Sequence, residues 1–101
     1  MLKYVDPKTF VGLPMVLKTV TPGEASVMVG NLRAGRILQQ VMAGQRHVYF
    51  WTLTSPYTVT AAIAASGEQD TLEAAKTALR TAFDAWLKWA LEQERPVVWY
   101  G

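Results

Sequence analysis

The chain has 101 residues, of which 50% are apolar and 18% are charged, and its formal net charge is +2. This length suits one domain with one core, and the apolar content excludes an intrinsically disordered chain. The absence of cysteine excludes a disulfide scaffold, a thiol nucleophile and thiolate-bound zinc.

The first 24 residues combine prolines with apolar side chains, and we expect them to form an extended N-terminal arm or edge strand. The arm precedes a single domain over residues 25–101. Charged residues and prolines interrupt residues 1–20, so this stretch matches neither a signal sequence nor a membrane span. We therefore expect a cytoplasmic protein that does not bind membranes.

Short runs rich in β-branched and aromatic residues, separated by glycine turns, predict strands over residues 26–30, 36–41 and 46–53. A fourth run, residues 58–65, begins with β-branched residues that favour a strand, although its alanines do not.

The strongest predicted strand, residues 46–53, has large side chains on both faces. Val48 and Phe50 point one way, whereas Tyr49, Trp51 and Leu53 point the other. Only one face can meet a helix. The N-terminal arm either covers the second face, which we favour, or leaves it open for binding.

A capped amphipathic pattern predicts one long helix from Asp70 to Gln93. Asp70 and Glu73 have the spacing of a capping box, and Pro96 disfavours helical backbone at Arg95. The apolar stripe of this helix comprises Leu72, Ala75, Leu79, Ala82, Phe83, Trp86 and Ala90. The elements together predict an α+β fold, an antiparallel meander of three to four strands packed on one long C-terminal helix.

The second half of the helix, with the tail that follows, carries more apolar side chains than one stripe needs. At about 100° per residue, Leu87, Trp89 and Leu91 cannot all point the same way as Trp86. Either the tail folds back over the helix within the same chain, or this end meets another subunit or a partner protein. The candidate partner-binding residues are Trp86, Leu87, Trp89, Leu91, Val97, Trp99 and Tyr100.

Residues 25–67 contain three arginines and no acidic residue, which gives this segment a net charge of +3. Arginines can contact phosphates and aromatic rings can stack on bases, so a weak nucleic-acid-binding surface is an alternative. Its candidate residues are Arg33, Arg36, Arg46, His47, Tyr49 and Trp51. The competing interpretation is an ordinary basic sheet surface, balanced by the acidic helix.

Several short motifs follow one another between residues 26 and 91. They are Val29-Gly30, Gly35-Arg36-Ile37, Tyr49-Phe50-Trp51-Thr52-Leu53, Gly67, Thr71-Leu72-Glu73, Ala75-Lys76 and Trp86-Leu87. This order resembles a family of small uncharacterised bacterial proteins, frequent among alphaproteobacteria. The aromatic strand of that family often reads Trp-Phe-Trp, whereas this chain has Tyr49 at the first position. The resemblance implies no activity.

A second resemblance rests on Gly67, Thr71, Glu73, Ala74 and Pro96. A three-stranded sheet followed by a helix with these residues is similar to antitoxins of the HicB type. That similarity implies a toxin as the protein partner, bound through the sheet and helix.

The remaining chemical groups indicate a protein that is not an enzyme. His47 is the only histidine, so neither a histidine-paired metal site nor a Ser-His-Asp arrangement with a spare ligand can be assembled convincingly. Glu68, Asp70 and Glu73 lie at a helix start, where the helix dipole explains them. We therefore expect no catalytic residue, metal, cofactor or small-molecule substrate.

We expect a small non-catalytic interaction domain that self-associates, or binds another protein, through the second half of the helix and the tail. The alternative is a weak nucleic-acid-binding or antitoxin-like regulator that uses the basic segment.

Overall fold

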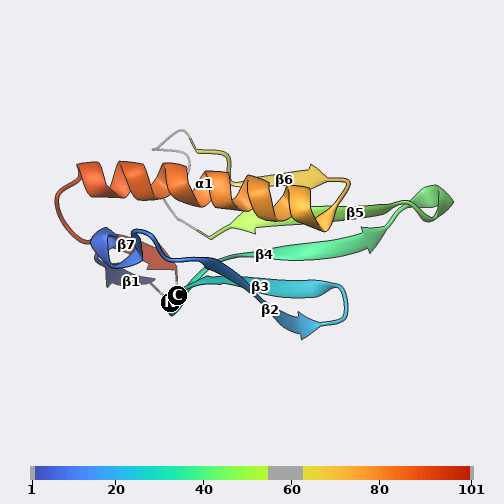
Figure 1. The fold of residues 1–101 in the computed structure, drawn as a ribbon, viewed down its shortest axis with the longest axis horizontal. Helices are drawn as coiled ribbons and strands as arrows, with labels where there is room; N and C mark the ends of the chain where they lie inside the picture. The colour runs from blue at the N-terminus through green and yellow to red at the C-terminus, as the bar shows by residue number, and fades with distance from the viewer. Residues whose placement is uncertain (1, 55–62, 101) are drawn as a thin grey trace.

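The computed structural model describes residues 2–54 and 63–100, which form seven strands, two short 3-10 helices and one long helix (Figure 1). In chain order these are β1 (Leu2–Val5), η1 (Pro7–Phe10), β2 (Met15–Thr21), β3 (Glu24–Val29), β4 (Leu32–Val41), η2 (Ala43–Gln45), β5 (His47–Leu53), β6 (Ser66–Gln69), α1 (Leu72–Glu92) and β7 (Val97–Tyr100).

The main sheet is antiparallel and has the strand order β2-β3-β4-β5-β6, so neighbours in sequence are neighbours in the sheet. The predicted α+β meander with one long helix is confirmed, but the sheet has five strands instead of three to four. The predicted strands over residues 26–30, 36–41 and 46–53 correspond to β3, β4 and β5. Most of the predicted strand over residues 58–65 lies outside the described residues, and β6 begins at Ser66.

Of the two forms expected for the N-terminal segment, an extended arm or an edge strand, the structure shows an edge strand. The first strand of this segment, β1, pairs with β7 from the opposite end of the chain, and β2 joins the main sheet as an edge strand beside β3. The segment therefore widens the sheet and does not cover the second face of β5. The physical reason is that Pro14 and Pro22 bracket a run that β3 can pair along its whole length.

Helix α1 begins at Leu72, two residues after the predicted start at Asp70, and its N-cap is Thr71 and not Asp70. The Thr71 hydroxyl accepts a hydrogen bond from the amide of Ala74 at 3.1 Å. At the other end Gln93 is the C-cap and Glu94 adopts a left-handed backbone with φ of 54°, which turns the chain before Pro96.

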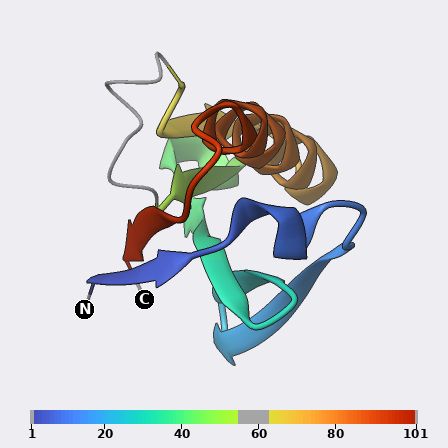
Figure 2. The same cartoon turned by 90° about the vertical axis from the view of Figure 1, so that its left-hand side faces the viewer.

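The N-terminal half of α1 packs on β4, β5 and β6, on one side of the sheet (Figure 2). Every residue of the predicted stripe except Leu72 is buried. Trp51 and Leu53 from β5 belong to the same core, whereas Val48 is buried outside the main cluster. Alternate side chains of β5 therefore lie on opposite faces of the sheet, as strand geometry requires.

Gly67 lies opposite Trp51 and allows the ring to approach the backbone of β6. A Cβ atom at Gly67 would lie 2.6 Å from Nε1 of Trp51. Because the ring is rigid and buried, only glycine fits at this position without displacing it.

The C-terminal half of α1 extends past the end of the main sheet and packs on a second layer, the ribbon formed by β1 and β7 (Figure 1). The two strands pair antiparallel from Leu2 opposite Tyr100 to Val5 opposite Val97. Phe10 of η1 and Trp99 of β7 are buried in the same cluster as Phe83 and Trp86. Both ends of the chain thus complete a core that begins under the main sheet.

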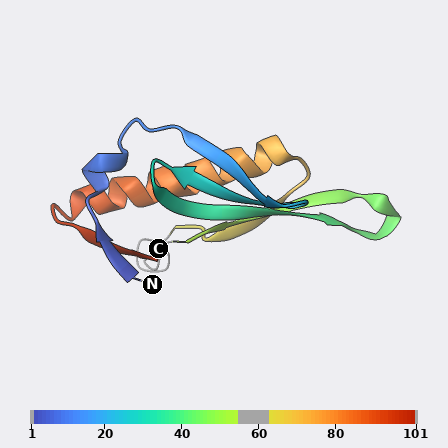
Figure 3. The ribbon, with the colours of Figure 1, turned by 90° about the horizontal axis from the view of Figure 1, so that it is seen from below.

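The β4–β5 hairpin projects beyond the helix at the opposite end of the molecule (Figures 1 and 3). All residues from Val41 to His47 are exposed, and η2 forms the turn between β4 and β5. The molecule measures 49 Å along its longest axis and 25 Å across.

Candidate functional site

Three aromatic rings join the C-terminal half of α1 to the tail. The rings of Trp86 and Trp99 meet edge to face with centroids 4.4 Å apart, and the Phe83 centroid is 6.1 Å from that of Trp99. Nε1 of Trp99 also donates a hydrogen bond to the main-chain carbonyl of Arg33 at 2.9 Å. The tail therefore folds back over the helix within the same chain.

This arrangement decides which of the predicted partner-binding residues remain accessible. Four of the seven are buried inside the chain: Trp86, Leu87, Val97 and Trp99. Trp86, Val97 and Trp99 pack in the core between α1 and the β1–β7 ribbon, whereas Leu87 also borders a surface hollow beside Val11 and Leu91. Trp89 and Leu91 are half-buried, and the side chain of Tyr100 lies outside the described part of the structure.

The accessible apolar groups at this end come from β1, α1, β7 and the residue that follows η1. Tyr4 of β1 is 77% exposed and Val11, directly after η1, is 57% exposed. They lie beside half-buried Trp89 and Leu91 of α1 and half-buried Val98 of β7. We call these five residues the helix-end surface.

The helix-end surface is concave. One hollow of about 490 Å³ is lined by Tyr4, Trp89 and Val98, and a second of about 470 Å³ by Val11 and Leu91. A smaller hollow of about 140 Å³ shares Leu91 with the second and Pro96 with the first. The three hollows therefore adjoin one another around the end of the helix.

Tyr4 and Val11 were not among the residues predicted from the sequence. The apolar content of the N-terminal segment was the only available signal. Their position depends on the pairing of residues 2–5 with residues 97–100, which no local pattern indicates.

The residues predicted to bind nucleic acid do not form one surface. Arg33 and Arg36 lie on the sheet face away from α1, opposite Met28 and Ser26 of β3. Arg46 is exposed and pairs with Glu68 at 3.6 Å.

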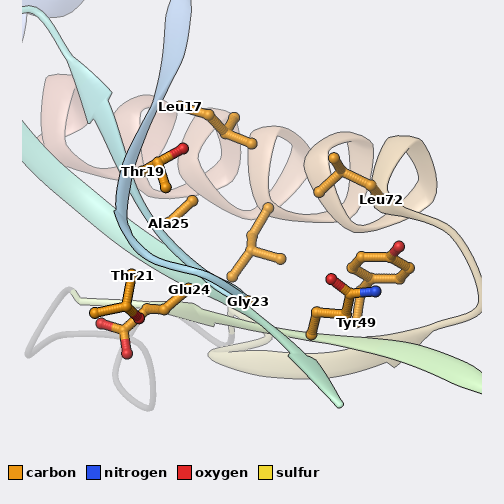
Figure 4. Close-up of a pocket in the computed structure, with 10 residues that line it drawn as sticks. Leu17, Thr19, Thr21, Gly23, Glu24, Ala25, Tyr49 and Leu72 are labelled. Atoms are coloured by element: carbon orange, nitrogen blue, oxygen red, sulfur yellow. The ribbon is translucent and has the colours of Figure 1, made fainter. Parts of the chain in front are cut away.

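The other three predicted residues lie on the face of β5 toward α1. Trp51 is buried and cannot stack on a base. His47 is exposed, and its Nδ1 lies 2.6 Å from Nε2 of Gln39. Figure 4 shows Tyr49 beside Leu72, at a hollow of about 230 Å³ between β2 and the start of α1.

In the part of the chain that the structure describes, no three histidine or acidic side chains come together as a group that could hold a metal ion. Over the same residues, no helix combines the length and apolar character needed to cross a bilayer. No protein-family model, curated protein or solved structure matches this chain.

Proposed function

We propose that this chain is a non-catalytic interaction domain that self-associates through the helix-end surface. The observation that carries the proposal is the exposure of Tyr4 and Val11 beside half-buried Trp89 and Leu91. Aromatic residues are enriched at the centres of protein interfaces. The sequence predicts self-association at this end of the molecule. The proposal retains that location but assigns the contact between copies to residues whose side chains remain accessible.

A second copy of the chain suits this surface because its rim carries both signs of charge. Asp84, Lys88 and Glu92 surround the hollow at Leu91, while Arg95 borders the hollow at Trp89. A two-fold interface brings the same patch of both copies together, so each cationic group can face an acidic group of the other copy.

Sedimentation equilibrium over a concentration series tests the proposal. We expect the apparent mass to rise from monomer toward dimer with concentration. Tyr4→Glu and Val11→Glu should each weaken association at least tenfold, because each places a charge in the apolar centre; tenfold corresponds to about 1.4 kcal/mol.

Val41→Glu is the matched control, since Val41 is 62% exposed on the β4–β5 hairpin, at the other end of the molecule. It should associate like the unmodified chain. A monomer at every concentration would refute self-association, and equal weakening by Val41→Glu would show that the helix-end surface is not the interface. Melting curves of all three variants identify any loss of folding.

A further inference from the structure

The face of the main sheet away from α1 carries a row of polar side chains that crosses four strands. Lys18 of β2 lies opposite Ser26 of β3, Ser26 opposite Arg36 of β4, and Arg36 opposite Thr52 of β5. We call this side of the sheet the open face. Since α1 packs on the other side, no helix among the described residues lies over the open face (Figure 2), although Val48 on this face is buried.

A β-bulge gives the open face a second arginine. Arg33 and Arg36 are three residues apart, so simple alternation would place them on opposite faces. Between Val27 and Met28 the β3–β4 register shifts and leaves Ala34 without a partner. Ala34 and Gly35 are both buried, and Arg33 and Arg36 are both exposed.

The three cations Lys18, Arg33 and Arg36 have no acidic partner within the described residues. The ion pairs there join Arg46 to Glu68, Lys76 to Glu73, and Arg80 to Asp84. Lys18 and Arg36 are two strands apart, which separates their backbones by about 10 Å. The cluster therefore keeps its charge available for an anionic ligand.

A half-buried aromatic ring lies next to these cations. Phe50 of β5 is directly opposite Leu38, and Arg36 is its diagonal neighbour across the β4–β5 pair. By alternation Phe50 is on the open face, since Trp51 and Leu53 face the core. Charge and a planar apolar ring thus share one surface.

We propose that the open face binds single-stranded nucleic acid, with phosphates at Lys18, Arg33 and Arg36 and one base stacked on Phe50. Cations that track a backbone next to an aromatic ring are the arrangement that single strands favour. Duplexes keep their bases stacked inside the helix and offer none to the ring. An acidic protein would use the cations but leave Phe50 without a role.

Acidic groups limit where the strand can lie. Glu24 is on the same face, opposite Leu38, and Glu68 is opposite Phe50 but is held by Arg46. The phosphates should therefore follow the row from Lys18 to Arg36 and avoid the Glu24 end. This site shares no residue with the helix-end surface, so each proposal can fail without the other.

Fluorescence anisotropy with a labelled dT12 oligonucleotide tests this proposal on the full chain. With three phosphate contacts to a single strand, we expect binding about 20-fold weaker at 200 mM than at 50 mM salt. Arg36→Ala should reduce the slope of log K against log salt by about 0.7, because one contact is lost. Lys76→Ala is the matched control: it removes a helix cation that pairs with Glu73, and it should leave the slope unchanged.

Phe50→Leu separates stacking from charge. It keeps an apolar side chain in the sheet but should weaken dT12 binding about fivefold or more, because base stacking is lost. Its melting temperature identifies a variant that has lost its fold. A 12-base-pair duplex should bind the unmodified chain more weakly than dT12.

Any of three results would overturn the proposal: no dT12 binding at 50 mM salt, the same loss in Lys76→Ala as in Arg36→Ala, or a duplex that binds as tightly as dT12 and is indifferent to Phe50→Leu. Tyr4→Glu should bind dT12 normally, and Arg36→Ala should self-associate normally, which distinguishes the two surfaces.

Discussion

At the residue scale, Trp99 links three elements that are distant in sequence. Its ring packs against Trp86 of α1, and its indole N–H bonds to the carbonyl of Arg33 in β4. Sequence patterns left open whether the tail folds back, since the partner of this N–H is a main-chain oxygen 66 positions away. Every residue has a main-chain carbonyl, so the sequence does not show which one accepts this hydrogen bond.

Trp99→Phe should therefore lower the free energy of unfolding by about 2–4 kcal/mol, because it removes ring volume and leaves the Arg33 carbonyl unpaired. Trp86→Phe is the matched comparison. Nε1 of Trp86 is buried without a hydrogen-bond partner among the described residues, so that substitution loses volume alone.

Urea denaturation of both variants measures this difference. We expect Trp99→Phe to be the more destabilised by about 1 kcal/mol or more. Equal losses would mean that the hydrogen bond to Arg33 contributes nothing.

At the element scale, substitutions at the start of α1 can distinguish the stability contributed by the N-cap hydrogen bond from that contributed by a nearby charge. The sequence placed the cap at Asp70, whereas the structure has Thr71 bonded to the Ala74 amide. Both residues prefer the N-cap position, and the choice between them depends on where β6 ends.

Thr71→Ala should destabilise the fold by about 1 kcal/mol through the lost cap, at any salt concentration. Asp70→Asn removes only a charge near the positive end of the helix, worth about 0.3–1 kcal/mol at low salt. Thermal unfolding at low salt and at about 0.5 M salt measures the loss of stability in both variants. At the higher concentration the Debye length falls well below about 10 Å, so the charge effect of Asp70 is screened. A large, salt-independent loss in Asp70→Asn would show that Asp70 is the cap.

The strands that sequence reasoning identified are those defined by local signals. Strands β3, β4 and β5 are bounded by glycine turns and carry β-branched or aromatic residues. An edge strand was expected within residues 1–24, but the bounds of β2 were missed because its run lies between prolines in a segment of mixed composition. The bulge at Ala34 was missed as well, and with it the fact that Arg33 and Arg36 share one face.

At the scale of the whole molecule, the N-terminal segment contributes to the same core as the rest of the chain. Val5 and Phe10 from the N-terminal segment are buried in the same cluster as Phe83, Trp86 and Trp99. The surplus of apolar residues on α1 was correctly recognised from the sequence. The groups that cover it could not be identified, because the β1–β7 pairing joins the two ends of the chain.

Tyr4 and Val11 are exposed at that same end, where we propose self-association, whereas Val16, Val20, Val41, Met42 and Leu72 are exposed elsewhere in the described chain. Amide chemical shifts recorded over a protein concentration series test this proposal most directly. We predict concentration-dependent shifts around Tyr4, Val11, Trp89 and Leu91, with constant shifts at Val41 on the distant hairpin. Constant shifts throughout, or changes of equal size at Val41, would contradict it.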